Sequence, residues 1–382
     1  MRSGIKTLHV SSGNLYGGIE TMLQGLARHR GVCPAIDPRF ALCFEGRIAD
    51  ELQASGVPTE ILGAVRFRKP WTVLAARRAL KRLLRRDRPD VVICHAPWPH
   101  AVFAPTVRRE GLPLAFWQHD AEGQRKFHDK IGTWTPPDLV IVNSHFTAGI
   151  STRRFPAAPA EVMYYPVSAP DPPANLAALR TEVRRELQTP DDSTVIVMTC
   201  RLEPYKGHTL LLDALGRLRD QPGWEAWIAG GIQRPHEREF LDELRRRAEV
   251  AGVADRVRFL GQRSDVPKLL AAADIHCQPN LGPEPFGIAF IEAMYAGLPI
   301  VTTGIGGALE IVTEACGILV PPNDPAALAD ILAGLLADPS RRAALGSCGP
   351  SRARQLCDPA VILERLAEIL KRLRVSQNSL SQ

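Results

Sequence analysis

The chain has 382 residues, of which 45% are hydrophobic and 23% are charged, a composition that excludes a mostly disordered chain. The length suits two domains of about 150–200 residues each. No apolar run reaches the ~20 residues of a membrane-spanning helix and no leader-like core follows Met1, so we expect a soluble, cytoplasmic protein. The eight cysteines include no C-x-x-C pair, and we therefore expect buried thiols and neither disulfides nor a metal centre.

The net charge of +6 is concentrated in the first half of the chain. Residues 1–168 contain 23 Lys and Arg against 14 Asp and Glu, whereas the remaining residues contain 24 against 27. A basic first half favours an anionic partner, which could be a nucleic acid, a membrane surface or a substrate. No aromatic residues interleave with the basic ones as base stacking would require, so no nucleic-acid partner is expected.

Short apolar runs alternate with helical patterns along the whole chain. In the first half, strands are predicted at 6–11, 40–44, 59–61, 91–94, 114–118 and 139–143, and helices include 19–29 and 72–86. In the second half, strands are predicted at 194–200, 225–229, 257–259, 275–277, 300–302 and 317–319, and helices include 210–219, 238–251 and 326–337. This alternation predicts an α/β fold with parallel sheets covered by helices on both faces.

A proline-rich segment divides the chain. Residues 164–174 contain four prolines and fit neither a helix nor a strand. We therefore predict an N-terminal domain at 1–168 and a C-terminal domain at 169–358, followed by a helix at 359–375 that can pack back on the first domain and a frayed tail at 376–382. Two Rossmann-like domains joined in this way would leave a cleft between them, and their sheets would bind ligands at the carboxyl ends of the strands.

Two pairs of glycines follow predicted strands. They are Gly17-Gly18, which precedes an amphipathic helical pattern, and Gly230-Gly231. Glycine lets the backbone approach a ligand closely, and the N-terminus of a helix favours an anion. Neither pair belongs to a G-x-G-x-x-G motif, so an ordinary tight turn at Gly17-Gly18 stays an open interpretation.

Polar residues also stand where predicted strands end. Arg201 and Lys206, five residues apart, could converge on a diphosphate, and His119 could donate a hydrogen bond to a hydroxyl or a phosphate. Taken singly, the two cations are typical of solvated surface charges, and His119 could equally be a structural loop histidine.

Two glutamates flank the start of a predicted helix. Glu284 precedes it and Glu292 lies in its second turn, with the free amides of Gly287–Ala289 between them. Those amides would attract an anion, so carboxylates beside them indicate contacts with the neutral hydroxyls of a sugar or ribose. Ordinary surface charge on a helix is the alternative.

Taken in order, these residues resemble the retaining glycosyltransferases of family 4, the group 1 glycosyl transferases. The similarity covers most of the chain and comprises Gly17-Gly18, His119-Asp120, Asn143-Ser144, Arg201 to Lys206-Gly207, Phe259-Leu260-Gly261, and Glu284 to Glu292. The resemblance implies the GT-B fold, which is an α/β fold of two Rossmann-like domains whose parallel sheets face each other across a cleft.

The resemblance also implies a role for each site residue. Arg201 and Lys206 would bind the donor diphosphate, Glu284 would contact the donor sugar, and Glu292 would bind the ribose hydroxyls. The implied catalytic set is Glu284, His119, Arg201 and Lys206. The implied donor-binding set is Gly17, Gly18, Arg201, Lys206, Gly230, Gly231, Glu284, Phe286, Gly287, Ile288, Ala289 and Glu292.

The implied reaction is the transfer of a hexose, with retention, from a nucleoside-diphosphate sugar. The expected donor is a UDP-sugar such as UDP-glucose, and the expected acceptor is a hydroxyl of a glycan or a lipid-linked molecule in polysaccharide or glycolipid biosynthesis. No cofactor or metal ion is expected, because the sequence has no Asp-x-Asp motif and because two cations and the helix amides would already neutralise the diphosphate. A sugar-nucleotide epimerase or hydrolase on the same fold is the alternative, and an inactive binding module is a further one.

The helix predicted at 72–86, from Thr72 to Arg86, indicates a second partner. Its apolar residues recur at steps of three and four, so one face can pack on the sheet while its basic residues stay outside. The basic face would then contact an anionic membrane surface, which would place the protein at the inner face of the cytoplasmic membrane. A merely solvated face is the alternative.

Overall fold

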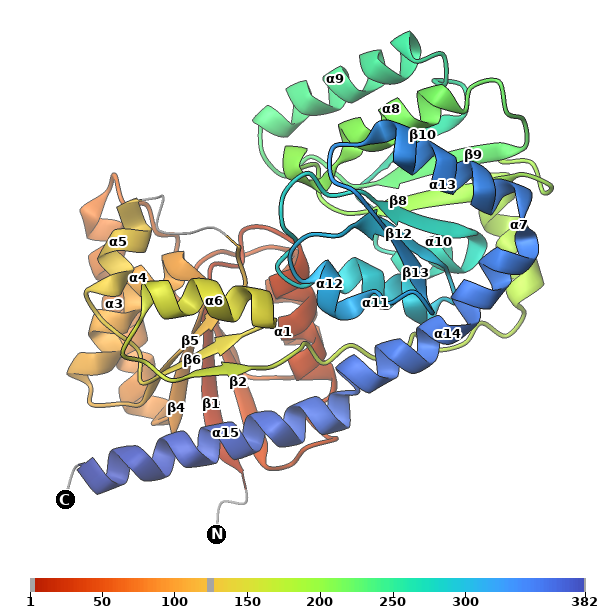
Figure 1. Ribbon diagram of the computed structural model, residues 1–382. Helices are drawn as coiled ribbons and strands as arrows, with labels where there is room; N and C mark the ends of the chain where they lie inside the picture. The colour runs from red at the N-terminus through yellow and green to blue at the C-terminus, as the bar shows by residue number, and fades with distance from the viewer. Residues whose placement is uncertain (1–3, 122–126, 381–382) are drawn as a thin grey trace. The chain divides into compact units, whose positions relative to one another are not determined.

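The structure is a computed structural model that describes residues 4–121 and 127–380 (Figure 1). The chain forms two compact units. The first contains the residues up to Val167 together with those from Cys357 onward, and the second contains Ser168–Leu356.

The first unit is a seven-stranded parallel sheet with the order β3-β2-β1-β4-β5-β6-β7. Its strands are β1 (Ile5–Ser11), β2 (Ile36–Leu42), β3 (Thr59–Ile61), β4 (Val91–His95), β5 (Leu114–Gln118), β6 (Leu139–Val142) and β7 (Ala160–Val162). Its helices are α1 (Gly18–Arg28), α2 (Arg47–Ala54), α3 (Pro70–Asp87), α4 (Pro97–Arg109), α5 (Phe127–Thr133), α6 (His145–Arg154) and α15 (Pro359–Leu380).

The second unit is a six-stranded parallel sheet with the order β10-β9-β8-β11-β12-β13. Its strands are β8 (Thr194–Thr199), β9 (Trp224–Ala229), β10 (Val257–Gly261), β11 (Ile275–Gln278), β12 (Ile300–Thr303) and β13 (Gly317–Val320). Its helices are α7 (Leu176–Glu186), the 3-10 turn η1 (Pro204–Lys206), α8 (His208–Arg217), α9 (His236–Val250), α10 (Val266–Ala272), α11 (Ile288–Tyr295), α12 (Ala308–Ile311), α13 (Pro325–Ala337) and α14 (Pro339–Cys357).

Both sheets confirm the predicted Rossmann-like α/β architecture. In each, the strand order reverses at one place, between β1 and β4 in the first unit and between β8 and β11 in the second. Ligands of open parallel sheets bind outside the carboxyl ends of the strands at such a switch point. The fold therefore singles out the loops that follow these four strands.

The second strand starts earlier than the predicted segment 40–44. β2 begins at Ile36 and includes Pro38, which has no N–H to donate. The N–H of Phe40 donates to the carbonyl of Pro58, 2.9 Å away, on the β3 side of the strand. Pro38 lies two residues earlier and so faces the same side, where β3 has not yet begun. Its missing donor therefore costs no bond in the sheet.

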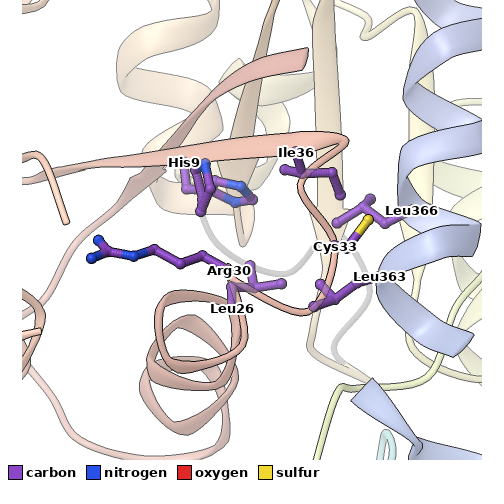
Figure 2. A pocket seen from close by; sticks show the side chains of 8 residues that line it. His9, Leu26, Arg30, Cys33, Ile36, Leu363 and Leu366 are labelled. Atoms are coloured by element: carbon purple, nitrogen blue, oxygen red, sulfur yellow. The ribbon is translucent and has the colours of Figure 1, made fainter. Parts of the chain in front are cut away.

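Helix α15 completes the first unit. Leu363 and Leu366 of this helix line a small pocket with Leu26 of α1, Cys33 and His9 (Figure 2). The backbone N–H of Val167 donates to the carbonyl of Cys357, 3.1 Å away. The predicted frayed tail is helical as far as Leu380, because no Gly or Pro follows Pro359 to stop the helix, and residues 381–382 lie outside the described part.

Six of the eight cysteines are buried, as expected from the sequence. Only Cys348 is exposed. Within the described residues, no helix combines the length and the hydrophobicity that crossing a membrane requires.

Candidate functional site

The site of the second unit starts at the loop that follows β8. This loop leads through Arg201 into η1, which ends at Lys206, and Gly207 then takes the left-handed backbone conformation with φ of 84°. A Cβ atom at Gly207 would overlap the carbonyl oxygen of Pro279, which follows β11. The carbonyl of Tyr205 accepts from the N–H of Leu281 at 2.8 Å. The loops after β8 and β11 are thus tied together at the switch point.

This tie brings together two of the predicted residues. The Lys206 ammonium donates to Oε2 of Glu284 at 2.6 Å, and both side chains are nearly buried. Burial alone would lower the pKa of Lys206, but the carboxylate of Glu284 beside it outweighs that effect, so the pKa lies above its ordinary value. Lys206 therefore stays charged throughout the physiological range.

Arg201 belongs to the same group of charges. Its guanidinium lies 3.0 Å from the carboxylate of Glu203 and is 29% exposed, which leaves part of it open to a ligand. Burial raises the pKa of the Tyr205 hydroxyl, and the charges of Lys206, Glu284, Glu203 and Arg201 all act on it. Arg201, Lys206 and Glu284, which the sequence predicted as site residues, therefore all lie near Tyr205.

Gln278 holds the carboxylate of Glu284 and was not among the predicted site residues. Its Nε2 donates to Oε2 of Glu284 at 3.1 Å and to Oδ1 of Asn280 at 3.0 Å. Within the described residues, Oε1 of Gln278 and Nδ2 of Asn280 are buried and have no partner. The signal in the sequence is the pair of amides around Pro279, because amide side chains at the end of a central strand are unusual unless they bind something.

The backbone of Glu284 is fixed from the other side. It pairs with Gly306, and the N–H of Gly307 donates to its carbonyl at 2.7 Å. Both glycines follow β12, and a Cβ atom on Gly306 would lie 2.5 Å from the Glu284 carbonyl oxygen. The exits of β8, β11 and β12 therefore build one rigid edge around this carboxylate.

Helix α11 begins at Ile288, four residues after Glu284. Gly287 precedes it with φ of 102°, and a Cβ atom there would overlap the ring of Phe290. The first amides of the helix, at Ile288 and Ala289, have no carbonyl partner within the helix. Phe286 is buried, so its backbone rather than its ring is suited to meet a ligand.

Glu292 lies in the second turn of α11. Burial raises the pKa of its carboxyl to about 7. Within the described residues, no hydrogen bond or ion pair reaches this carboxylate. A partly desolvated carboxylate without a protein partner is suited to accept hydrogen bonds from neutral hydroxyl groups.

The two glycine pairs have structural explanations of their own. A Cβ atom on Gly230 would overlap the carbonyl of Cys200, and one on Gly231 would overlap Gln262, so close packing at the strand exits requires both glycines. In the first unit, Gly17 caps α1 and its N–H donates to Oε2 of Glu20 at 3.0 Å. The side chain of Glu20 thus already occupies part of the helix N-terminus where an anion was expected.

His119 lies at the exit of β5 in the first unit. Its Nε2 is 2.9 Å from Nδ1 of His95, and its Nδ1 is 2.5 Å from the hydroxyl of Tyr165. Both ring nitrogens therefore bond within the unit, so a ligand could bond to either nitrogen only by displacing one of these partners.

The site in the second unit can bind an anion and a polyhydroxylated group together. Arg201, Lys206 and the first amides of α11 supply positive charge, while Glu284 and Glu292 supply acceptors. Among the described residues, no group of three or more His, Cys, Asp or Glu side chains is arranged to hold a metal ion.

Comparison with known families gives two matches that together span most of the chain. Residues 180–352 match the family described as "Glycosyl transferases group 1", and residues 16–169 match "Glycosyltransferase Family 4". A GDP-mannose-dependent alpha-(1-6)-phosphatidylinositol monomannoside mannosyltransferase of Mycobacterium tuberculosis is 31% identical over 293 residues, which cover 71% of this chain and 72% of that protein.

Other relatives match over shorter stretches. The lipopolysaccharide core biosynthesis mannosyltransferase LpsB of Rhizobium meliloti is 30% identical over 56% of each chain, and a Corynebacterium glutamicum mannosyltransferase is 31% identical over 59% of this chain. The chain spans about half the length of these relatives, 56% and 55% respectively.

Solved structures match over nearly the whole chain. Anabaena HepE in complex with UDP and glucose has a TM-score of 0.82 and 25% identity, with 96% of this chain and 99% of that chain covered. A sucrose-phosphate synthase from Thermosynechococcus elongatus has a TM-score of 0.76 at 20% identity, which is a likeness of fold alone.

Proposed function

Since the chain belongs to glycosyltransferase family 4 and has its GT-B fold, we propose that it transfers a hexose from a nucleoside-diphosphate sugar to a hydroxyl group of an acceptor. The observation that carries the proposal is the buried pair of Lys206 and Glu284 beside Arg201, at the switch point between β8 and β11. A diphosphate needs the cations, and a sugar next to it needs the carboxylate.

Each part of the site has a place in this reaction. Arg201, Lys206 and the backbone amides at the start of α11 bind the diphosphate, Glu284 accepts hydrogen bonds from the transferred sugar, and Glu292 accepts from the ribose hydroxyls. The acceptor oxygen forms a bond to the anomeric carbon on the face from which the diphosphate departs. The bond from that carbon to the phosphate oxygen breaks, and the acceptor proton passes to the leaving phosphate. The configuration is retained, and the protein contributes position and charge.

We propose GDP-mannose as the first donor to test and UDP-glucose as the second. The name of the tuberculosis relative includes GDP-mannose, and that relative matches 71% of this chain. UDP-glucose, the donor expected from the sequence, is supported by HepE structures that contain UDP with glucose and UDP alone, at 25% identity. The names of the relatives also favour an acceptor that is a lipid or a lipid-linked glycan.

A donor panel tests the function. The full chain is incubated with GDP-mannose, UDP-glucose and ADP-glucose, each alone and with phosphatidylinositol vesicles or lipopolysaccharide core oligosaccharide. We expect one donor to raise the melting temperature and to label an acceptor. Conversion of a donor alone to an isomer or a free sugar at the same rate would instead identify an epimerase or hydrolase. Absence of binding by every donor would contradict the proposal.

We expect transfer to survive excess EDTA. Lys206, Arg201 and the helix amides supply the positive charge that the departing diphosphate requires, so added metal has little left to neutralise. The measurement is the transfer rate with and without chelator, after removal of metal from all reagents. A complete loss of activity that Mg²⁺ or Mn²⁺ restores would contradict this prediction.

We also propose that α3 contacts an anionic membrane surface. Its residues Ala76 and Leu80 are buried against the sheet, whereas Trp71 is 64% and Leu74 is 50% exposed. Glu110 pairs with Lys81 and Arg85, and Glu60 and Asp87 pair with Arg86, so part of the basic face is neutralised within the protein. Within the described residues, no ion pair involves Arg78 or Arg82. The contact then rests on these two charges together with the exposed apolar side chains.

We expect the chain to bind vesicles that contain anionic lipid, and expect salt to weaken the binding. A variant with Arg78→Glu and Arg82→Glu should lose it and keep its donor affinity. Arg245→Glu with Arg246→Glu on α9 is the control for net charge, since both residues lie in the second unit on an exposed face. If the α3 variant and the α9 control variant sediment equally with anionic vesicles, the basic face of α3 is only a solvated surface.

A further inference from the structure

Buried side chains of the first unit form a continuous chain of hydrogen bonds across the sheet. Nε2 of His9, on β1, is 3.1 Å from Oγ1 of Thr7, and Nδ1 of His9 is 2.9 Å from Nε2 of His95. Nδ1 of His95 is 2.9 Å from Nε2 of His119, and the chain continues to the hydroxyl of Tyr165. All five residues are buried, and neighbouring imidazoles stack with ring centroids 5.2 Å apart. We call Thr7, His9, His95, His119 and Tyr165 the histidine chain.

The partners of Tyr165 give the histidine chain a direction. Oγ1 of Thr147 donates to Oδ1 of Asn143 at 2.9 Å, which leaves Nδ2 of Asn143 to donate to the Tyr165 oxygen at 2.8 Å. Since the Tyr165 oxygen already accepts from Asn143, we assign the Tyr165 proton to Nδ1 of His119, 2.5 Å away. A neutral imidazole has one donor and one acceptor nitrogen, so each histidine in turn must donate from Nε2. The order ends with Nε2 of His9 donating to Thr7.

Protonation of any of the three histidines would break this order, because an imidazolium donates from both nitrogens. At His9 or His95 it would set two N–H groups against each other across a 2.9 Å contact, and at His119 it would oppose the hydroxyl proton of Tyr165. Burial lowers the pKa of His9 and of His119 to about 3 each, and burial together with the neighbouring histidines lowers that of His95. The histidine chain is therefore neutral at physiological pH.

The histidine chain also crosses the switch point of the first sheet. It runs from β1 to β4, reaches His119 at the exit of the neighbouring strand β5, and ends at Tyr165, which follows β7. Ligands of such sheets bind at these exits. Arg201, Lys206 and Glu284 of the proposed donor site all belong to the second unit, whereas the histidine chain belongs to the first.

We propose that Tyr165, Asn143, His95 and His9 are positioning residues that hold His119 in its Nε2–H form and so fix the exit of β5 as part of the acceptor site. This proposal rests on the proposed function. His119 then contributes its place and its backbone rather than a proton, since both of its nitrogens are engaged. Positioning of this kind affects turnover when the supported group meets the reacting molecules.

The hydrogen-bond order can be measured without any substrate. We expect ¹⁵N NMR spectra of the full chain labelled in histidine to show three neutral Nε2–H imidazoles at pH 7. Tyr165→Phe removes the donor to His119, and we expect His119 and then His95 and His9 to become mixtures of tautomers. His100→Phe is the control, because His100 is buried in the same unit but bonds to the carbonyl of Thr135 instead.

A second variant tests which end sets the direction. Thr7→Val removes only the last acceptor, so it should leave all three histidines in the Nε2–H form. Three protonated or Nδ1–H histidines in the unchanged protein would overturn the inference, as would a Tyr165→Phe spectrum identical to that of the unchanged protein. Reversal of the tautomers by Thr7→Val would overturn the assigned direction.

Kinetics then test the role. We expect Tyr165→Phe to lower kcat by about tenfold, while the donor KM changes less than about twofold because the donor site lies in the other unit. An unchanged kcat with the altered tautomers would overturn the positioning role. If the unchanged protein transfers no sugar, the proposed function fails, and the NMR result still decides whether the histidine chain is ordered as described.

Discussion

Replacing Lys206 by alanine is expected to lower kcat/KM by about 10²-fold or more, which corresponds to roughly 3 kcal/mol of lost transition-state stabilisation. The ammonium lies 2.6 Å from the Glu284 carboxylate in the present structure. Without it, a buried carboxylate would face the departing diphosphate with one cation fewer, and the two negative charges would repel each other.

The sequence provides a matched control for this variant. Lys268 is the only other lysine between residues 168 and 356, and it is exposed on α10. Lys268→Ala should leave kcat/KM unchanged. Because an unpaired buried carboxylate also destabilises the fold, the double variant Lys206→Ala with Glu284→Gln should regain stability but not activity. Turnover close to normal in Lys206→Ala would show that Lys206 and Arg201 do not form the diphosphate site.

Acidification from pH 7 to pH 5 is expected to destabilise both units. Burial lowers the pKa of His9, His119 and His276 to about 3, and burial is the main reason that His100 and His208 titrate near 4. Each is neutral in the folded state at pH 5, whereas an unfolded histidine with a pKa near 6.5 takes up a proton. The unfolded state therefore binds more protons, and stability falls as pH falls, by about 2 kcal/mol per histidine over this range.

One group acts in the opposite sense. The carboxyl of Glu292 has a folded pKa of about 7, so the folded state takes up its proton first and offsets about one histidine in the second unit. His9, His100 and His119 of the first unit have no such compensation and would together remove about 6 kcal/mol, a large share of the 5–15 kcal/mol typical of folded proteins.

Urea unfolding at pH 7 and pH 5 measures this effect. His100→Phe should reduce the loss of unfolding free energy between pH 7 and pH 5 by about 2 kcal/mol, the contribution of one buried histidine. His236→Gln, at an exposed position of α9, should leave that loss unchanged. Equal unfolding midpoints at the two pH values would contradict the prediction.

The sequence predicts most of the fold because its strands are dense in apolar residues. β8 and β9 are fully buried runs between turn residues, and their predicted bounds lie within a residue of those observed. β7 was not predicted, because it lacks such an apolar run. It has three residues, all of them exposed or half-buried, and pairs with β6 alone, so it shows neither a period nor an apolar run.

Some residues of the candidate site could be predicted from the sequence and others could not. Arg201, Lys206 and Glu284 could be grouped from the sequence because the carboxyl ends of parallel strands meet at one edge of a sheet. The support of Glu284 by Gln278 depends on the path of the loop after β11, which no local pattern reveals. The histidine chain is still less visible, since Thr7 and His9 lie on β1, His95 on β4, and His119 and Tyr165 in segments that follow β5 and β7. Only the pairing of these strands brings the side chains together.

The place of α15 has a consequence for how the protein is made. The second unit is one uninterrupted stretch of chain, Ser168–Leu356, whereas the first unit needs residues from both sides of it. Because synthesis runs from the N-terminus, β1 and α1 are made before the second unit, whereas α15, which lines a pocket with His9 and Leu26, is made after it. During synthesis the second unit can fold to completion while the first still exposes an apolar face. The half of the chain that is translated first is therefore the half that finishes folding last.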